Sequence, residues 1–310
     1  MEILLQVLLL AAGFCMLVKG ADWFVDGAAG IAEKFGIPHL VIGLTIVAMG
    51  TSAPEAAVSI TAALKGNAGI TIGNIVGSNI LNILIILGIA SVIVPIAVAK
   101  STVQVEIPYM LAITILLLVL GYTGNKIVFW EGAVLWAAFI LYLAYLFWMA
   151  KKNKEEAPEN AEEKPVWKLL LLVVVGLGLI MLGSDVAVDA ATAIAKILGM
   201  SERLIGLTIV ALGTSLPELV TSVSAARKGK ADIAIGNIVG SNIFNILFVV
   251  GTTALITPVV FEAKFVIDML ISGAAGVLLW VCVFKDHKLS RTGGLVMLAG
   301  YAAYFLYLIS

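Results

Sequence analysis

Charged side chains are scarce in this sequence, and their scarcity indicates the class of protein. Only 13% of the 310 residues are charged and 61% are hydrophobic, with a mean hydropathy of +1.10. A soluble domain carries about 25% charged residues. A helix that crosses the roughly 30 Å hydrocarbon core needs about 20 mostly apolar residues, and several such stretches are present. The short alternating strands of a membrane β-barrel are missing. The sequence therefore predicts an all-α integral membrane protein in a lipid bilayer.

Cysteine and histidine are also rare. Cys15 and Cys282 both lie in apolar runs and form neither a disulfide framework nor a metal-binding spacing. His39 and His287 are isolated near predicted loops, and no nucleophile–base pair accompanies them. The net charge of −1 offers no basic surface. We expect no enzyme activity, no resident cofactor and no nucleic-acid partner.

The chain contains the same unit twice. The segment VIGLTIVAMGTSAPE ends at Glu55, and LIGLTIVALGTSLPE ends at Glu218. Two further pairs are ITIGNIVGSNILNIL (70–84) with IAIGNIVGSNIFNIL (233–247), and GADWFVDGA (20–28) with GSDVAVDAA (183–191). All three pairs are offset by 163 residues without a gap. One constant offset indicates duplication.

Each copy holds five apolar spans. In the first copy they are approximately 2–26, 39–63, 69–96, 105–122 and 129–150. In the second they are approximately 168–190, 202–226, 232–258, 262–284 and 292–309. We expect a first five-helix repeat over 1–150, a charged, proline-bearing linker over 151–167 and a second repeat over 168–310. The first apolar run lacks a basic start and a small-residue cleavage site, so it is predicted to be a retained span.

An odd number of spans per copy inserts the second copy in the opposite orientation. The loops on the side of the linker hold Lys34, Lys100, Lys151, Lys152, Lys154, Lys164, Lys168, Arg227, Lys228, Lys230, Lys285, Lys288 and Arg291. The opposite loops hold only Lys65, Lys126, Lys196, Arg203 and Lys264. The positive-inside rule then predicts a multi-pass plasma-membrane protein with a cytoplasmic linker and both termini outside. Inverted repeats are typical of secondary transporters, whose sites lie near the midplane.

The first duplicated motif places polar groups beside a helix break. Thr51, Ser52 and Glu55 share one helix face, because their spacings are four and three. Thr214, Ser215 and Glu218 repeat the pattern. The prolines that precede both glutamates have no N–H and break the helical hydrogen bonding, which frees backbone carbonyls. Carbonyl, hydroxyl and carboxylate oxygens together suit a hard cation such as Ca²⁺.

The second duplicated motif adds an amide and hydroxyl stripe. The stripe positions recur at every fourth residue: Asn74, Ser78 and Asn82, then Asn237, Ser241 and Asn245. Glycines between them, at 73, 77, 236 and 240, allow close helix packing. Such a stripe alone is more often packing than a binding site. Two helices per repeat nevertheless predict a central cage that contains two carboxylates.

The carboxylates near mid-span distinguish a binding site from simple helix packing. Insertion scales put the cost of such a group at about 2.5–3.5 kcal/mol, and it is usually functional. Two glutamates at equivalent positions, each flanked by hydroxyls, therefore indicate a cation site. The duplicated aspartates Asp22, Asp26, Asp185 and Asp189 fall near predicted span ends. We interpret those as caps at headgroup level, with Lys19 beside Asp22.

These paired motifs resemble the two α-repeats of the calcium/cation antiporter superfamily, and in particular its prokaryotic sodium/calcium exchanger branch. The resemblance covers nearly the whole chain. It implies ten transmembrane helices arranged as two inverted five-helix repeats. It also implies cation sites on helices two, three, seven and eight, exposed alternately as helices one and six slide across that bundle.

The resemblance also implies a ligand set. Glu55 and Glu218 correspond to ligands shared by Ca²⁺ and Na⁺. The residues that would add hydroxyl, amide and backbone carbonyl oxygens are Thr51, Ser52, Thr214, Ser215, Ser78, Ser241, Asn82, Asn245, Ala48 and Ala211. Members often have an aspartate at the position of Asn245, so this site has two formal negative charges, enough to neutralise one Ca²⁺.

The expected activity is antiport of Ca²⁺ against Na⁺, by a protein that functions as a monomer. Either one Ca²⁺ or several Na⁺ neutralise the two glutamates, so the ions compete for the same carboxylates. Exchange of Ca²⁺ or another divalent cation against protons is the alternative. A channel is disfavoured, because channels rarely need an inverted duplicate around a closed midplane site.

Overall fold

The computed structural model describes residues 2–66, 68–153, 164–200 and 211–309. Long helices dominate them, and several are interrupted by π-helical turns. Helices of the first repeat are α1 (Glu2–Phe35), α2 (His39–Ile42), η1 (Gly43–Val47), α3 (Ala48–Thr51), α4 (Ala53–Leu64), η2 (Ala68–Ile70), α5 (Thr71–Leu81), η3 (Asn82–Leu87), α6 (Gly88–Ile93), η4 (Thr102–Glu106), α7 (Ile107–Gly124) and α8 (Phe129–Lys152). Helices of the second are α9 (Val166–Ile197), α11 (Ala211–Thr214), α12 (Leu216–Arg227), α13 (Ala231–Phe244), η6 (Asn245–Val250), α14 (Gly251–Ile256), α15 (Lys264–Phe284) and α16 (Arg291–Ile309).

The described helices confirm a mostly helical membrane protein. Seven of them are long and apolar enough to cross a bilayer, and the count is eight if the bent pair 39–51 and 53–64 forms one span. The predicted span 202–226 begins in residues that lie outside the described part of the chain. The predicted span 292–309 corresponds to α16. The total of ten spans stays a prediction.

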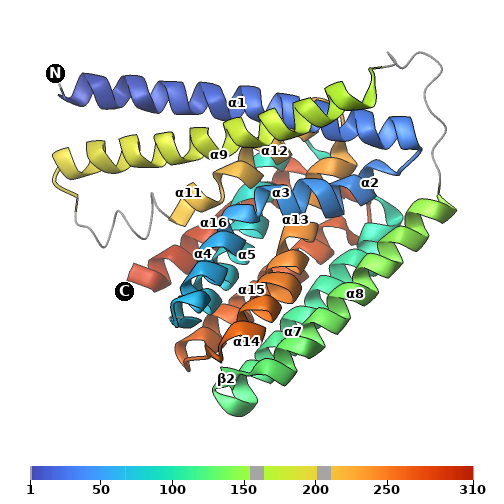
Figure 1. The fold of residues 1–310 in the computed structure, drawn as a ribbon, viewed down its shortest axis with the longest axis vertical. Helices are drawn as coiled ribbons and strands as arrows, with labels where there is room; N and C mark the ends of the chain where they lie inside the picture. The colour runs from blue at the N-terminus through green and yellow to red at the C-terminus, as the bar shows by residue number, and fades with distance from the viewer. Residues whose placement is uncertain (1, 67, 154–163, 201–210, 310) are drawn as a thin grey trace.

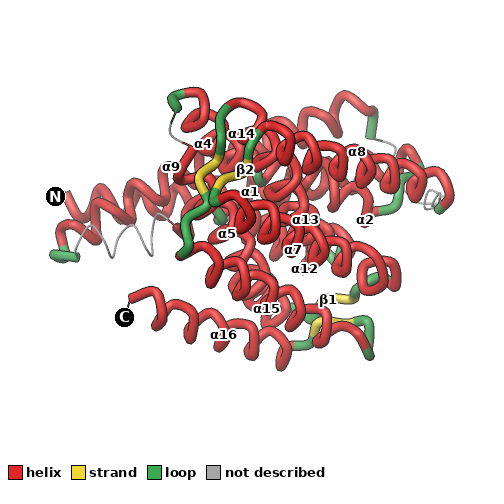
Figure 2. The backbone as a smooth tube through the Cα atoms, turned by 90° about the horizontal axis from the view of Figure 1, so that it is seen from below, coloured by secondary structure: helices red, strands yellow, loops and turns green. Residues whose placement is uncertain are grey.

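The third and eighth predicted spans form a buried centre, while two long helices lie at the side. Within the described residues, 94% of the apolar window in 231–256 is buried inside the protein, against 17% for α1. Figures 1 and 2 show α1 and α9 running together along one side of the bundle, with α5 and α13 inside it. The centre is therefore built from α13 and its repeat equivalent α5. The outer helices keep apolar side chains exposed, as a surface against lipid requires.

Helices α1 and α9 pack backbone against backbone. A Cβ built on Gly20 would lie 2.8 Å from the carbonyl oxygen of Gly176, and one built on Gly13 would lie 2.9 Å from that of Gly183. These glycines are seven residues apart on each helix and are related by the 163-residue offset. Because only glycine permits this approach, the two helices form one tightly joined unit. The two helices are longer than predicted, with 34 and 32 residues.

Short strands at the two ends of the bundle join the repeats. β1 (Ile96–Ala97) pairs with β4 (Lys288–Leu289), and β2 (Lys126–Ile127) pairs with β3 (Val259–Val260). The 163-residue offset relates β1 to β3 and brings β2 to within one residue of β4, so the two pairings lie at corresponding places in the repeats. Each repeat therefore contacts the other reciprocally, as expected from a two-fold pseudosymmetric duplicate.

Replacing Gly176 by alanine tests the packing of α1 on α9. The added Cβ would lie 2.6 Å from the backbone nitrogen of Phe24, so α1 and α9 must separate. Overpacking of this kind costs about 1–3 kcal/mol, and we expect a lower Tm in detergent. Gly178→Ala, on the same helix with no described atom within 4 Å, is the control. Equal Tm values for both variants would contradict the tight interface.

Candidate functional site

A broken helix in the first repeat presents a buried glutamate. α3 ends at Thr51 and α4 begins at Ala53, and the two axes differ by 50°. Ser52 lies at the break, and Pro54 occupies the first turn of α4. Because proline is tolerated at a helix start but not in its interior, the chain restarts here. Glu55 follows in the first turn of α4.

The second repeat contains the same break. Ser215 separates α11 from α12 with φ −93° and ψ 2°, close to the −83° and 8° of Ser52. Pro217 and Glu218 follow in the first turn of α12. The helix break that the prolines predict is thus found in both repeats. In each it moves a glutamate to the start of a new helix, where the N–H groups and the helix dipole favour an anion.

The two glutamates lie deep in the protein and near each other. Glu55 and Glu218 are each 1% exposed, and Ser52, three residues before Glu55, contacts Glu218. Ser52 Oγ donates a hydrogen bond to Glu218 Oε1 at 2.8 Å, and Ser78 Oγ donates to Glu55 Oε1 at 3.3 Å. No lysine, arginine or histidine of the described residues forms an ion pair with either carboxylate. The centre of the protein therefore contains two acidic groups without a basic partner.

Hydrogen bonds between the repeats hold the broken helix in place. Thr51 Oγ1 donates to Asn237 Oδ1 at 3.0 Å, and Ser241 Oγ donates to the carbonyl of Ala48 at 3.3 Å. Thr51 also lies within hydrogen-bond distance of the Val47 and Ala48 carbonyls. The predicted oxygens of one repeat thus meet the stripe of the other. This brings Ser241 to the Ala48 carbonyl, which lies 193 residues away in sequence and one helical turn before Thr51.

Two stripe asparagines support the glutamate backbones. Asn74 Nδ2 donates to the Glu55 carbonyl at 3.3 Å and to Ser59 Oγ at 3.0 Å. In the second repeat, Asn237 Nδ2 contacts the Glu218 carbonyl at 3.4 Å and Ser222 Oγ at 2.9 Å. These amides orient the turns that carry the carboxylates. Ser59 and Ser222 were missed from sequence, although both lie four residues after a duplicated glutamate.

A reciprocal asparagine network joins the two central helices. Asn82 Nδ2 donates to Asn242 Oδ1 at 2.9 Å, and Asn245 Nδ2 donates to Asn79 Oδ1 at 3.1 Å. Asn79 Nδ2 and Asn242 Nδ2 each donate to the backbone carbonyl of the other residue, at 3.3 and 3.2 Å. The four bonds fix the side chains of Asn82 and Asn245. Asn79 and Asn242 were not among the predicted site residues, yet they are part of the duplicated motif.

Several oxygens at this centre have no hydrogen-bond partner. The buried, unpartnered side-chain oxygens that belong to predicted site residues are Glu55 Oε2, Glu218 Oε2, Asn82 Oδ1, Asn245 Oδ1 and Ser215 Oγ. Leaving a buried acceptor without a partner costs about 1–3 kcal/mol, and more for a charged group. A cluster of such acceptors is chemically a ligand set for a hard cation.

Two π-helical segments begin at the central amides. η3 starts at Asn82 and η6 starts at Asn245, which are equivalent positions. A π-turn widens the helix, and such turns occur frequently at functional sites. Nothing in the apolar sequence that follows either asparagine distinguishes a π-turn from an α-helix. This feature was therefore absent from the sequence-based prediction.

The remaining predicted residues lie at the edge of the described segment. Thr214, the last residue of α11, is half-buried and has an interaction partner. Ala211 is the first residue of α11, and residues 201–210 before it lie outside the described part. The close packing predicted for Gly236 and Gly240 is found: an added Cβ would lie within 3.1 Å of α2–α3 atoms. For Gly73 and Gly77 it is not found among the described residues, since a Cβ on Gly73 would meet only the Phe265 ring at 3.4 Å and one on Gly77 would meet no described atom within 4 Å.

A further buried carboxylate, that of Glu106, lies outside the duplicated motifs. Glu106 is fully buried where η4 joins α7, and Tyr145 of α8 donates a hydrogen bond to it. Its repeat equivalent is Met269, so the position is not duplicated. Glu106 connects two helices outside the duplicated motifs and is not part of the central cluster.

Known proteins with similar sequences and structures are sodium/calcium exchangers and other membrane proteins. The profile of the family described as "Sodium/calcium exchanger protein" matches residues 5–148 and 168–310. Sodium/calcium exchanger MaX1 of Methanosarcina acetivorans is 32% identical over 99% of both chains. Inner membrane protein YrbG of Escherichia coli is 34% identical over 96% of this chain and 95% of its own. A solved structure of the sodium–calcium exchanger NCX_Mj at zero Na⁺ and Ca²⁺ is 34% identical, with a TM-score of 0.84 and 99% coverage of both chains.

These matches extend over almost the whole chain, and the family profile matches once in each half. The protein belongs to the sodium/calcium exchanger family and is a membrane transporter of its prokaryotic branch. The similarity predicted from the duplicated motifs is confirmed.

Replacing Asn79 by leucine tests the asparagine network. The variant removes a donor to Asn242 and leaves the buried amide of Asn245 without its acceptor, which costs about 1–3 kcal/mol. We expect Tm in detergent to fall by about 3–8 °C. Ser91→Ala is the control, because Ser91 donates only within its own helix, to the Gly88 carbonyl. A fall no larger than that of Ser91→Ala would show that the network contributes little stability.

Proposed function

We propose that the protein is a secondary antiporter that exchanges Ca²⁺ for Na⁺ by alternating access at the central cluster. One observation carries this proposal: within the described residues, two buried carboxylates from equivalent positions have no basic partner, and unpartnered oxygens surround them. Uncompensated charge is strongly disfavoured in a low-dielectric interior. A bound cation supplies the missing charge and satisfies the free oxygens together.

The proposed ligand set follows the predicted residues. Glu55 and Glu218 bind both ions. Hydroxyl, amide and carbonyl oxygens are contributed by Thr51, Ser52, Thr214, Ser215, Ser78, Ser241, Asn82, Asn245, Ala48 and Ala211. The contacts of Ser52 with Glu218 and of Ser241 with the Ala48 carbonyl support an arrangement shared between the repeats. Since both glutamates come from one chain, a monomer contains the whole proposed site.

Exchange follows from competition for two carboxylates. One Ca²⁺ neutralises them, or several Na⁺ do, and both sets do not fit the same charge. Two close anions without a cation repel each other strongly in low dielectric. The unloaded carrier would therefore be held back from crossing between its two states. Leak is then suppressed, and the ions move in opposite directions.

We also propose the finer architecture that this mechanism needs. Ten spans form two inverted five-helix repeats, 1–150 and 168–310, joined by a linker over 151–167. The reciprocal pairing of β1 with β4 and of β2 with β3 supports the inversion. The excess of Lys and Arg on the linker side supports a cytoplasmic linker with both termini outside, in a plasma membrane.

Uptake of ⁴⁵Ca²⁺ into proteoliposomes tests the ion exchange. We expect uptake driven by an outward Na⁺ gradient, reduced at least about tenfold in Glu55→Gln and in Glu218→Gln, because each change removes one of the two charges that hold Ca²⁺. Glu106→Gln is the matched control, since it alters a buried carboxylate outside the cluster and should retain uptake.

Other uptake results would indicate a different site, a different coupling ion or a different divalent cation. Full uptake in both cluster variants would overturn the proposed site. Uptake that responds only to an imposed pH gradient would assign the protein to proton-coupled exchange, with the same glutamates carrying the protons. Competition by Mg²⁺ or Mn²⁺ against ⁴⁵Ca²⁺ would show whether another divalent cation is preferred.

Proteolysis tests the orientation. With a protease site inserted in the linker 151–167, we expect cleavage in inside-out membrane vesicles and protection in intact cells. Cleavage in intact cells would reverse the proposed topology. The flanking residues Lys151–Asn153 and Lys164–Pro165 are exposed.

A further inference from the structure

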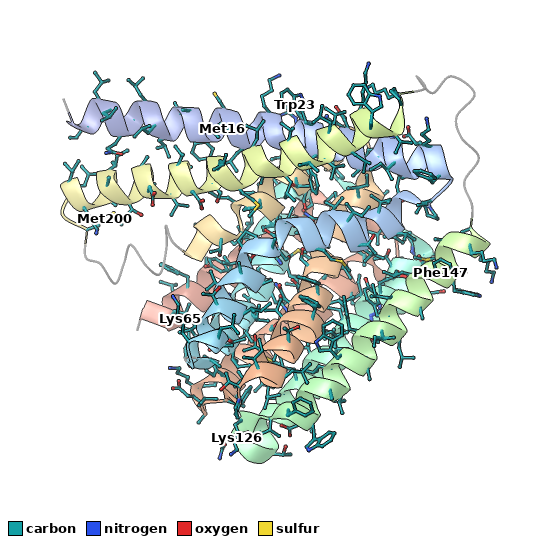
Figure 3. All side chains as sticks on the ribbon, viewed as in Figure 1. Met16, Trp23, Lys65, Lys126, Phe147 and Met200 are labelled. Atoms are coloured by element: carbon teal, nitrogen blue, oxygen red, sulfur yellow. The ribbon has the colours of Figure 1, made fainter. Side chains whose placement is uncertain are left out.

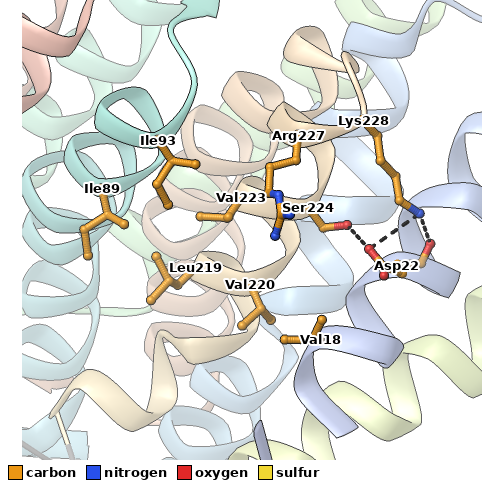
Figure 4. A pocket seen from close by; sticks show the side chains of 10 residues that line it. All are labelled: Val18, Asp22, Ile89, Ile93, Leu219, Val220, Val223, Ser224, Arg227 and Lys228. Carbon is orange, nitrogen blue, oxygen red and sulfur yellow. Dashed lines mark hydrogen bonds and ion pairs between the residues drawn. The ribbon is translucent and has the colours of Figure 1, made fainter. Parts of the chain in front are cut away.

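A cavity on the linker side separates α1 from the central bundle. It has a volume of about 610 Å³ and is lined by residues of α1, α6 and α12. Val18 and Asp22 of α1 face the cavity (Figure 4). Val220 and Ser224 of α12 face it from the other side, together with Lys228, which directly follows α12. Lys230, two residues after Lys228, pairs with Glu33, and the next residue, Lys34, donates to the Lys164 carbonyl, so this cavity lies on the linker side of the central cluster.

Polar contacts hold α1 against α12 at this cavity. Ser224 Oγ donates to Asp22 Oδ1 at 2.7 Å, and Lys228 Nζ lies 2.7 Å from Asp26 Oδ1 and 3.6 Å from Asp22 Oδ1 (Figure 4 shows the Asp22 contacts). Lys228 Nζ also donates to the Asp22 backbone carbonyl at 2.9 Å. We call this set of four side chains the linker-side latch. It replaces the predicted pairing of Asp22 with Lys19, because α12 brings Lys228 over the aspartates.

Each of these four side chains has an equivalent in the other repeat, on the opposite side of the bundle. The 163-residue offset relates Asp22, Asp26, Ser224 and Lys228 to Asp185, Asp189, Thr61 and Lys65. Aspartates, hydroxyl and lysine are all retained. By contrast, the neighbouring ion pair of Lys230 with Glu33 has Asn67 and Lys196 as its equivalents, so its chemistry is not duplicated.

On that opposite side the contacts are not formed. None of the hydrogen bonds or ion pairs of the described residues joins Lys65 or Thr61 to Asp185 or Asp189. A second cavity, of about 660 Å³, is lined here by residues of α4 and the lysine after it, with none from α9: Ala57, Val58, Thr61, Ala62 and Lys65. Figure 3 shows Lys65 at the end of the bundle opposite Phe147. Among the described residues, the latch is therefore formed on one side and not formed at the equivalent place.

We propose that these residues form two alternating latches. In the state described here Lys228 holds α1 to α12 on the linker side. In the other state Lys65 and Thr61 hold Asp185 and Asp189 of α9 to α4, and the linker-side latch is broken. This rests on the proposed antiport function, since alternating access requires two such states.

The packing of α1 on α9 couples the two latches. Because their glycine-lined backbones are in direct contact, the pair moves as one body relative to the bundle. Motion that withdraws α1 from α12 then carries α9 along the bundle as well. The latch side chains are partly exposed, at 28% for Lys228 and 48% for Asp26. Exposed pairs of this kind favour one state only about two- to fivefold, so the latch can open in each cycle.

Cross-linking in the intact protein reports which latch is closed. The background is Cys15→Ala with Cys282→Ser. One reporter carries Val18→Cys and Val220→Cys, which line the linker-side cavity. The other carries their equivalents, Met181→Cys and Ala57→Cys. Each pair joins the two repeats, so after treatment with a short bismaleimide and cleavage in the linker, only cross-linked halves run as one band.

The two lysines provide matched variants with opposite expectations. In Lys228→Met the first reporter should cross-link less and the second more, and their ratio should shift about two- to fivefold. In Lys65→Met the ratio should shift the other way. Lys126→Met, a lysine on the same side as Lys65 but on β2, should leave the ratio unchanged. Shifts in the same direction, or none in either variant, would overturn the proposal.

The readout separates this proposal from the proposed function. Cross-linking needs no transport, so it succeeds or fails whether Ca²⁺ exchanges for Na⁺ or for protons. Asp26→Asn provides a second test if Lys228→Met is not monodisperse, because it weakens the same latch and must shift the ratio in the same direction.

Discussion

The structure depends on one electrostatic constraint: two carboxylates are buried at the centre, and in the part of the chain that the structure describes no basic side chain pairs with them. Glu55 and Glu218 come from the starts of two restarted helices, one in each repeat, and the hydroxyls of Ser78 and Ser52 donate hydrogen bonds to them. A basic residue at this place would neutralise the centre permanently. Without one, neutralisation depends on what binds, so the loading of the site and the energy of the whole protein are linked.

Around that centre, strong and weak contacts are divided in a way that suits a carrier. The asparagine network and the close packing of Gly236 and Gly240 make the central helices a fully buried unit. Helices α1 and α9 form a second unit through their own glycines. Between the two units lie a cavity and partly exposed ion pairs. The fold therefore places its weakest interactions where relative motion would occur.

Much of the site was predictable because its chemistry is local. A proline three residues after a duplicated glycine-threonine predicts the helix break, and a glutamate directly after it gives the buried acid. The stripe of Asn and Ser at every fourth residue predicts a polar helix face. The packing of α1 on α9 was not predicted, since glycines seven residues apart in an apolar helix do not show which helix they approach. The prediction that Lys19 lies beside Asp22 as its partner was also wrong. The partner is Lys228, which is 206 residues away in sequence.

The sequence by itself determined the membrane class, the duplication and the kind of atom that each site residue offers, because composition, a constant offset and helical spacing are all properties of the linear chain. Only the tertiary structure decided which of those atoms are paired and which remain free. Ser52 meets Glu218, and Asn82 meets Asn242, across more than 150 residues. No local periodicity encodes such contacts, because they arise only when two repeats pack around a common centre.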